Sequence, residues 1–184
     1  MSAKNAIKAA LERVEQLLTL KPERGQRVYR SIATSGEGTA CVVEEGGHRL
    51  TLDVGKALGG ADLGPSPSVM LRAAMSGCIA IGITQAAARR DVPIDGVTVV
   101  LETDVDARGQ LGLADGIRPG FEAVRLVIDV ISPADKDVVE QMVETSLRVS
   151  PLMDVFETPH PVVREVVVAA AGAPGRPTAD NNAA

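Results

Sequence analysis

One long, mostly apolar stretch from Gly64 to Arg90 constrains the fold more than any other part of the chain. Ser66 is suited to cap a helix N-terminus, and Pro67 suits the first helical position because its missing N–H is not needed there. The run then continues without a proline to Arg89-Arg90, which suits the negative end of the helix dipole, and Pro93 stops it. Most of the circumference is apolar or small, which predicts a long buried helix.

A membrane span is the alternative for a run of this length, and its composition argues against that interpretation. Arg72 interrupts the run near its start, and Ser76, Thr84 and Gln85 dilute it. A span needs about twenty mainly apolar residues, and alanine and glycine add little hydrophobic driving force. We therefore expect a core helix and no membrane partner. Residues 1–20 carry charges throughout, unlike the apolar centre of a signal peptide.

The composition fits one globular domain with an aliphatic core. The 184 residues are 45% hydrophobic, but Tyr29, Phe121 and Phe156 are the only aromatic side chains. A net charge of −5 and so few stacking side chains disfavour nucleic-acid binding, which needs a basic face. Two cysteines, Cys41 and Cys78, are too few for a disulfide framework, so we expect a reducing, cytoplasmic location.

The residues before the central helix predict an amphipathic helix and an antiparallel meander. Apolar side chains recur at helical spacing over Ala3–Leu20, and Pro22 and Gly25 follow. Three strand-like segments come next, separated by glycine-containing turns typical of hairpins. The predicted strands are Arg27–Ala33, Thr39–Glu44 and Arg49–Val54.

The residues after the central helix predict further strands and a second long helix. Ser132-Pro133 repeats the cap-and-proline pattern and opens a helix that continues through Val149. The other predicted elements are strands at Val97–Asp106, Val124–Ile131 and Val162–Val168, and a short helix at Leu152–Phe156.

The predicted fold class is α+β, with a meander and C-terminal strands packed around the long helix. We divide the chain into an amphipathic helix (residues 1–22), a main domain (23–171) and a disordered tail (172–184) rich in Gly, Pro, Asn and Ala. A helix that is apolar nearly all round must be covered on every face. A second subunit is a natural way to complete that cover, so we expect a homodimer.

The central helix also carries the motifs of a known family. The chain resembles the osmotically inducible protein C / organic hydroperoxide resistance (OsmC/Ohr) superfamily from about Arg27 to Val168, and the order of elements is similar. The motifs are Gly64-x-x-Pro67, Ala73-Ala74, Cys78 eleven residues after Pro67, the segment 92–97 before a long strand, the segment Gly112–Phe121, and a second helix that ends near a small residue followed by proline.

The resemblance implies an intertwined homodimer that reduces organic hydroperoxides in oxidative stress defence. In that family the helix cysteine attacks the peroxide as a thiolate, becomes a sulfenic acid, and condenses with a second cysteine on the other long helix. A glutamate at the start of the cysteine helix and an arginine from the meander polarise the site. Cys78 matches the attacking cysteine, whereas Ser150 and Ser68 occupy the positions of the second cysteine and the glutamate.

These departures predict how such a site would have to work. Arg27, Arg30 and Arg49 lie in the meander half of the chain but are not clearly in register with the family arginine. Because Ser150 cannot resolve a sulfenate, no disulfide should join the two helices of one chain. An external reductant, either a small thiol or a dihydrolipoyl-type thiol, would have to restore Cys78.

Helix geometry limits what the chain itself can offer Cys78. The residue lies about 15 Å past the helix start, so the N-terminal dipole gives it little. Gln85 and Arg89 share its face, whereas Arg72 lies roughly 120° away, close to the direction of Ser68. We hypothesise that Arg72 faces the dimer seam and stabilises the Cys78 thiolate of the other chain. The alternative is that Arg72 reaches solvent at the helix start.

No other constellation points to a reaction. His48 and His160 have no ligand spacing around them, so we expect no metal site, and no motif indicates a cofactor. Two functions remain open: a one-cysteine thiol peroxidase, or a non-catalytic homodimer that binds a small apolar ligand beside the helix. In the second case Cys78 is a small buried hydrophobe. Cys41 has no matching role in either, and we interpret it as structural.

Overall fold

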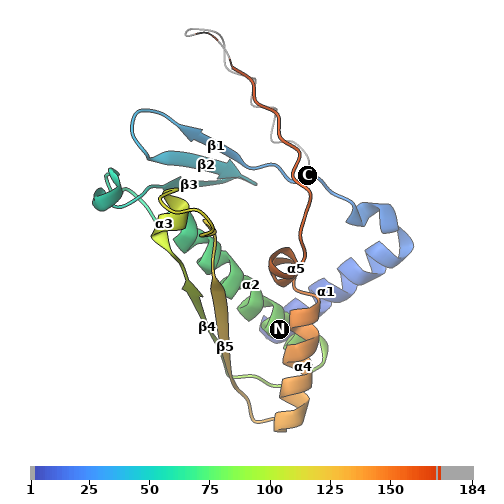
Figure 1. The fold of residues 1–184 in the computed structure, drawn as a ribbon. Helices are drawn as coiled ribbons and strands as arrows, with labels where there is room; N and C mark the ends of the chain where they lie inside the picture. Colours follow the sequence, from blue (N-terminus) through green and yellow to red (C-terminus); the bar gives the residue numbers. More distant parts are fainter. Residues whose placement is uncertain (1–2, 169, 171–184) are drawn as a thin grey trace. The chain divides into compact units, whose positions relative to one another are not determined.

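The computed structural model describes residues 3–168 and 170 of the chain. Helices and antiparallel strands are combined along it in an α+β arrangement (Figure 1). The elements are α1 (Ala3–Leu20), a 3-10 turn (Pro22–Gly25), β1 (Ile32–Ser35), β2 (Cys41–Glu45), β3 (His48–Leu52), a second 3-10 turn (Lys56–Leu58), α2 (Pro67–Arg89), β4 (Gly96–Asp104), α3 (Ala107–Gln110), β5 (Ala123–Ile131), α4 (Lys136–Arg148) and α5 (Pro151–Glu157).

The chain forms two compact units. The first joins the N-terminal residues up to Arg24 with Arg72–Thr158, so it contains α1, most of α2, the β4–β5 hairpin, α4 and α5. The second comprises Gly25–Leu71 and the residues from Pro159 onward, and it contains the β1–β2–β3 meander. These contact-based units do not test the predicted division into an amphipathic helix (residues 1–22) and a main domain (23–171). That division therefore stays a prediction.

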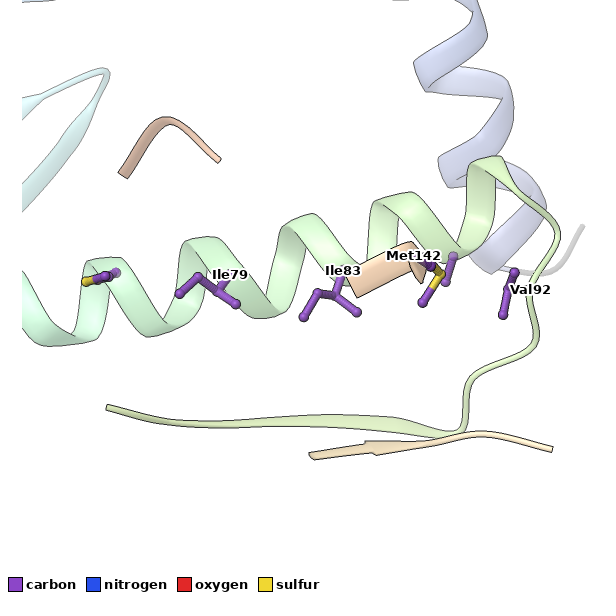
Figure 2. Packing of buried hydrophobic residues seen from close by; sticks show 6 residues of the cluster. Ile79, Ile83, Val92 and Met142 are labelled. Atoms are coloured by element: carbon purple, nitrogen blue, oxygen red, sulfur yellow. The ribbon is translucent and has the colours of Figure 1, made fainter. Parts of the chain in front are cut away.

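The core of the first unit is built on α2. Met75, Ile79, Ile83 and Ala87 recur every four residues, which places them on one face of the helix, and all are buried. That face packs on the antiparallel β4–β5 hairpin, and Figure 2 shows Ile79 and Ile83 directed at it. Met142 of α4 and Val92, which follows α2, complete the cluster. The hairpin contributes three directly opposed apolar pairs, Val97–Val130, Val99–Ile128 and Leu101–Leu126.

Part of the surface of α2 is left exposed by the described residues. The long helix and its bounds are as predicted, and a single subunit leaves part of the helix surface exposed, since Ile81 is 61% exposed. One hairpin and the C-terminal helices can cover only one face of a helix. α2 is long and apolar enough to cross a membrane, by length and composition only. The core helix of a protein without a membrane span can have the same length and composition. In this structure the buried side chains of α2 belong to the hydrophobic core.

Local signals set both ends of α2. The Met70 N–H donates to the Ser66 carbonyl, which makes Ser66 the residue at which the helix begins. At the other end Asp91 takes a left-handed conformation (φ 57°), and the Val92 N–H donates to the Ala87 carbonyl at 3.0 Å. This is the bonding of a Schellman motif, with Val92 as its buried apolar contact. The helix therefore ends at Arg89, before Pro93 is reached.

In the second unit, Asp53 organises the segment that leads into α2. Its buried carboxylate accepts hydrogen bonds from the Thr39 hydroxyl (2.6 Å) and from the backbone N–H groups of Val54, Ala61 and Leu63. Gly64, the first residue of the family motif, passes so close to β3 that a Cβ would lie 2.1 Å from the Thr51 carbonyl oxygen. Only glycine fits there.

The meander is confirmed, but three other predicted features are wrong. β1 begins at Ile32 because residues 27–31 have no strand opposite them, and Tyr29 is 77% exposed. The second long helix begins at Lys136, since the Ser132 hydroxyl bonds Ala134 and Pro93 in a turn before it. The segment 162–168 belongs to no strand, because no strand among the described residues pairs with it. The predicted tail at 172–184 lies outside the described residues.

Candidate active site

Cys78 lies at the middle of α2, next to Ile79 of the buried stripe. Its side chain is half-buried and it borders a groove of about 990 Å³ formed by α1, α2 and the end of α4. The sulfur is therefore both held by the core helix and open to a small molecule. Cys41, on β2, is also free and half-buried, and it belongs to the other unit.

The floor of the groove is made of small residues. Because they have little or no side chain, they leave room above the helix beside the sulfur. Gln85 and Arg89 line the same groove, as their helical spacing from Cys78 predicts. Ile81 stands in it as a large exposed apolar side chain. The small floor residues are Ala73, Ala74, Gly77, Gly82 and Ala86.

The wall opposite α4 is provided by α1, a contribution that the sequence did not reveal. Its ion pairs hold it to the C-terminal end of α2: Lys8 bonds Asp91, and Glu15 bonds Arg89 at 2.5 Å. The hydrogen bond from Lys8 lowers the pKa of Asp91 and raises that of Lys8. The charged residues of the groove thus collect at the α1 side and at the far end of α2.

A polar side chain from the junction of α4 and α5 contacts Cys78. The Ser150 hydroxyl oxygen lies 3.7 Å from the Cys78 sulfur, and Ser150 is 8% exposed. The sequence had placed Ser150 at the family position of the second cysteine, and the structure brings this position directly to Cys78. Ser146, also buried, borders the groove one turn earlier on α4.

Arg72 is not brought to Cys78 within the chain. It is half-buried, six residues before the cysteine, and does not line the groove. Among the described residues no carboxylate lies within ion-pair distance of it. Over the same part of the chain, no three His, Cys, Asp or Glu side chains come together as metal ligands.

Comparison with protein families matches residues 59–165, more than half of the 184 residues, to OsmC-like protein. The chain belongs to the OsmC-like protein family. The match includes the motif at Gly64, Cys78 and Ser150, and it leaves out α1 and the meander. A search of curated proteins finds no significant match.

Solved structures of the OsmC-like family have the same fold. An OsmC-like protein from Mycoplasma pneumoniae superposes with a TM-score of 0.62 at 15% identity, over 72% of this chain and 89% of that one. An OsmC-like protein of unknown function from Vibrio cholerae gives 0.59 at 13%, over 72% and 96%. An organic hydroperoxide resistance protein from Elizabethkingia anophelis gives 0.54 at 18%, over 72% and 90%. At these identities the similarity concerns the fold.

Proposed function

We propose that this OsmC-like protein is a thiol-dependent peroxidase that reduces organic hydroperoxides through Cys78. The observation that carries the proposal is the placement of Cys78, half-buried in the core helix and bordering an open groove. A structural cysteine has no need of such a groove. The relative from Elizabethkingia anophelis, an organic hydroperoxide resistance protein, supports the substrate class.

The reaction needs one sulfur and one external reductant. The Cys78 thiolate attacks the outer peroxide oxygen; an S–O bond forms, the O–O bond breaks, and the alcohol leaves after taking up a proton. The sulfur is oxidised by two electrons to sulfenic acid. One molecule of a small or dihydrolipoyl-type thiol condenses with it and releases water. A second thiol group then frees Cys78 as a thiol and leaves the reductant as a disulfide.

The need for an external reductant follows from the presence of a serine, Ser150, beside Cys78. A hydroxyl at 3.7 Å from the sulfur cannot form the disulfide that a second cysteine there would form. The cycle depends on reduced thiols in the surroundings, which agrees with the reducing, cytoplasmic location that we expect.

We further propose that the protein is a homodimer that buries more than about 2,000 Å² in total, as obligate dimers do. The uncovered face of α2, with Ile81 61% exposed, supports this proposal. The half-buried Arg72 guanidinium without a carboxylate partner among the described residues fits our hypothesis that it serves the thiolate of the other subunit. Sedimentation at micromolar concentration tests the dimer, and a monomer there contradicts it.

A second candidate function is a non-catalytic homodimer that binds a small apolar ligand. The groove of about 990 Å³, floored by alanine and glycine, favours this alternative because it could hold such a ligand without any reaction at Cys78.

Stoichiometric consumption of cumene hydroperoxide by the reduced protein separates the two candidates. We expect fast loss of about one equivalent and one added oxygen on Cys78 by mass spectrometry. Cys41→Ser should react like the parent protein, and Cys78→Ser should not react. Ser150→Cys should instead give a disulfide with Cys78, because the two side chains are already in contact. Consumption no faster than that of Cys78→Ser would refute the peroxidase.

A further inference from the structure

Ser150 is fixed in place by several hydrogen bonds. It is the N-cap of α5, and its hydroxyl oxygen accepts from the Met153 N–H at 3.5 Å. Its own N–H donates to the Leu147 carbonyl and its carbonyl accepts from the Asp154 N–H, both at 3.1 Å. The side chain is therefore a rigid part of the junction between α4 and α5, aimed at α2.

The other hydrogen bond of the Ser150 hydroxyl favours Ser150 as the donor in its contact with Cys78. A hydroxyl has one proton to donate and lone pairs to accept with. The Met153 N–H occupies an accepting position, so the proton is left over. Ser150 is 8% exposed, and buried hydroxyls rarely leave a proton unpaired. Cys78 Sγ, at 3.7 Å, is the partner that lies beside it.

We propose that Ser150 is a positioning residue that donates a hydrogen bond to the Cys78 sulfur and holds it as the reactive thiolate. A donor favours the charged form of its acceptor, and the thiolate is the form that attacks. A cysteine at this position would resolve the sulfenic acid; the serine acts one step earlier, on the attacking form. For the peroxide step this inference rests on the proposed function.

The charged groups that line the groove beside Cys78 come from α1 and from the C-terminal end of α2. In the groove, α4 and its junction with α5 present no charged side chain. The end of α2 presents Arg89, and the turn after it presents Arg90; they lie eleven and twelve residues beyond Cys78, which is more than about 15 Å along the helix axis. α1 presents Lys8, Glu12 and Glu15, of which Lys8 is bonded to Asp91 and Glu15 to Arg89.

The test uses two variants of the same shape. Ser150→Thr keeps the hydroxyl and Ser150→Val lacks it. Iodoacetamide alkylation of Cys78, followed on its own peptide by mass spectrometry so that Cys41 does not interfere, reports the thiolate without any peroxide. We expect the rate near pH 7 to fall about tenfold in Ser150→Val and to stay near the parent rate in Ser150→Thr. At a pH high enough to ionise every thiol, the rates should converge.

The controls separate this role from structure. Ser76→Ala removes a hydroxyl two residues from Cys78 that bonds the Arg72 and Ala73 carbonyls, so it should leave the profile unchanged. Loss of the α5 cap or partial unfolding would expose the thiol and raise its alkylation rate, the opposite direction. Equal profiles for Ser150→Val and the parent, or an equal fall in Ser150→Thr, would overturn the proposal. If the alkylation rate of Cys78 falls in Ser150→Val but the parent protein consumes no peroxide, the proposed role of Ser150 is upheld and only the peroxidase activity is rejected.

Discussion

In the first compact unit the buried side chains are mostly apolar, whereas the only buried side chain described between residues 25 and 71 is the carboxylate of Asp53. The apolar cluster around α2 gains its stability from removing surface from water, which has no preferred direction and depends little on charge. The Asp53 cluster depends on directed hydrogen bonds to one anion. Packing thus holds the helix that carries Cys78, and one charge holds the segment before it.

The largest effect that we expect comes from a cavity in the apolar cluster. Ile83→Ala removes a side chain that is 0% exposed, and it should lower the free energy of unfolding by about 2–5 kcal/mol. Ile131→Ala, at the end of β5 and 67% exposed, is the matched control, because Ile131 lies outside the apolar cluster. Urea unfolding measures both. If the two variants lose equal stability, then burial of Ile83 in the apolar cluster contributes no more to the stability of the fold than an exposed isoleucine does.

A smaller and pH-dependent effect should come from Asp53. The hydrogen bond from Thr39, with those from Leu63, Val54 and Ala61, lowers the pKa of Asp53 to about 2. Since the folded state has the lower pKa, the charge stabilises it above pH 3.8, and this contribution is lost as the pH falls through about 2. Asp53→Asn should be less stable than the parent near pH 7, and its stability should depend less on pH in that acidic window.

Urea midpoints at several pH values measure the contribution of Asp53, and Asp129→Asn is the control because that carboxylate is exposed on β5. A parallel pH dependence in Asp53→Asn and the parent would mean that the cluster is not held by charge.

The smallest effect should come from the exposed ion pair between Lys8 and Asp91, because water and salt screen exposed charges. This effect can be compared with that of the buried carboxylate of Asp53. Asp91→Asn keeps a residue that tolerates the left-handed conformation but removes the charge that holds Lys8 of α1. Hydrogen exchange of the α1 amides should accelerate by about twofold to threefold at low salt. In 1 M salt, where the Debye length is about 3 Å, parent and variant should agree. A large effect that persists in salt would show that packing rather than charge is lost.

Helical and strand patterns in the sequence were enough to predict most elements, because those patterns are local. The bounds of α1 and α2 follow from the spacing of apolar residues and from Ser66 and Pro67. The meander follows from its glycine turns. The segment 162–168 has the same alternating pattern, yet it forms no strand, because a strand also needs an edge to pair with.

The sequence by itself determined the cysteine helix, the family motifs and Cys78 as the candidate nucleophile, since each depends on neighbours within a few turns. Only the tertiary structure decided which residues meet the sulfur. Ser150 is 72 residues away from Cys78 in the chain, and α1, which walls the groove, lies outside the family match. Asp53 likewise reads as an ordinary strand-end carboxylate until the chain folds its four donors around it. Such contacts depend on how the folded elements pack against one another, and the local spacing of residues in the sequence does not predict that packing.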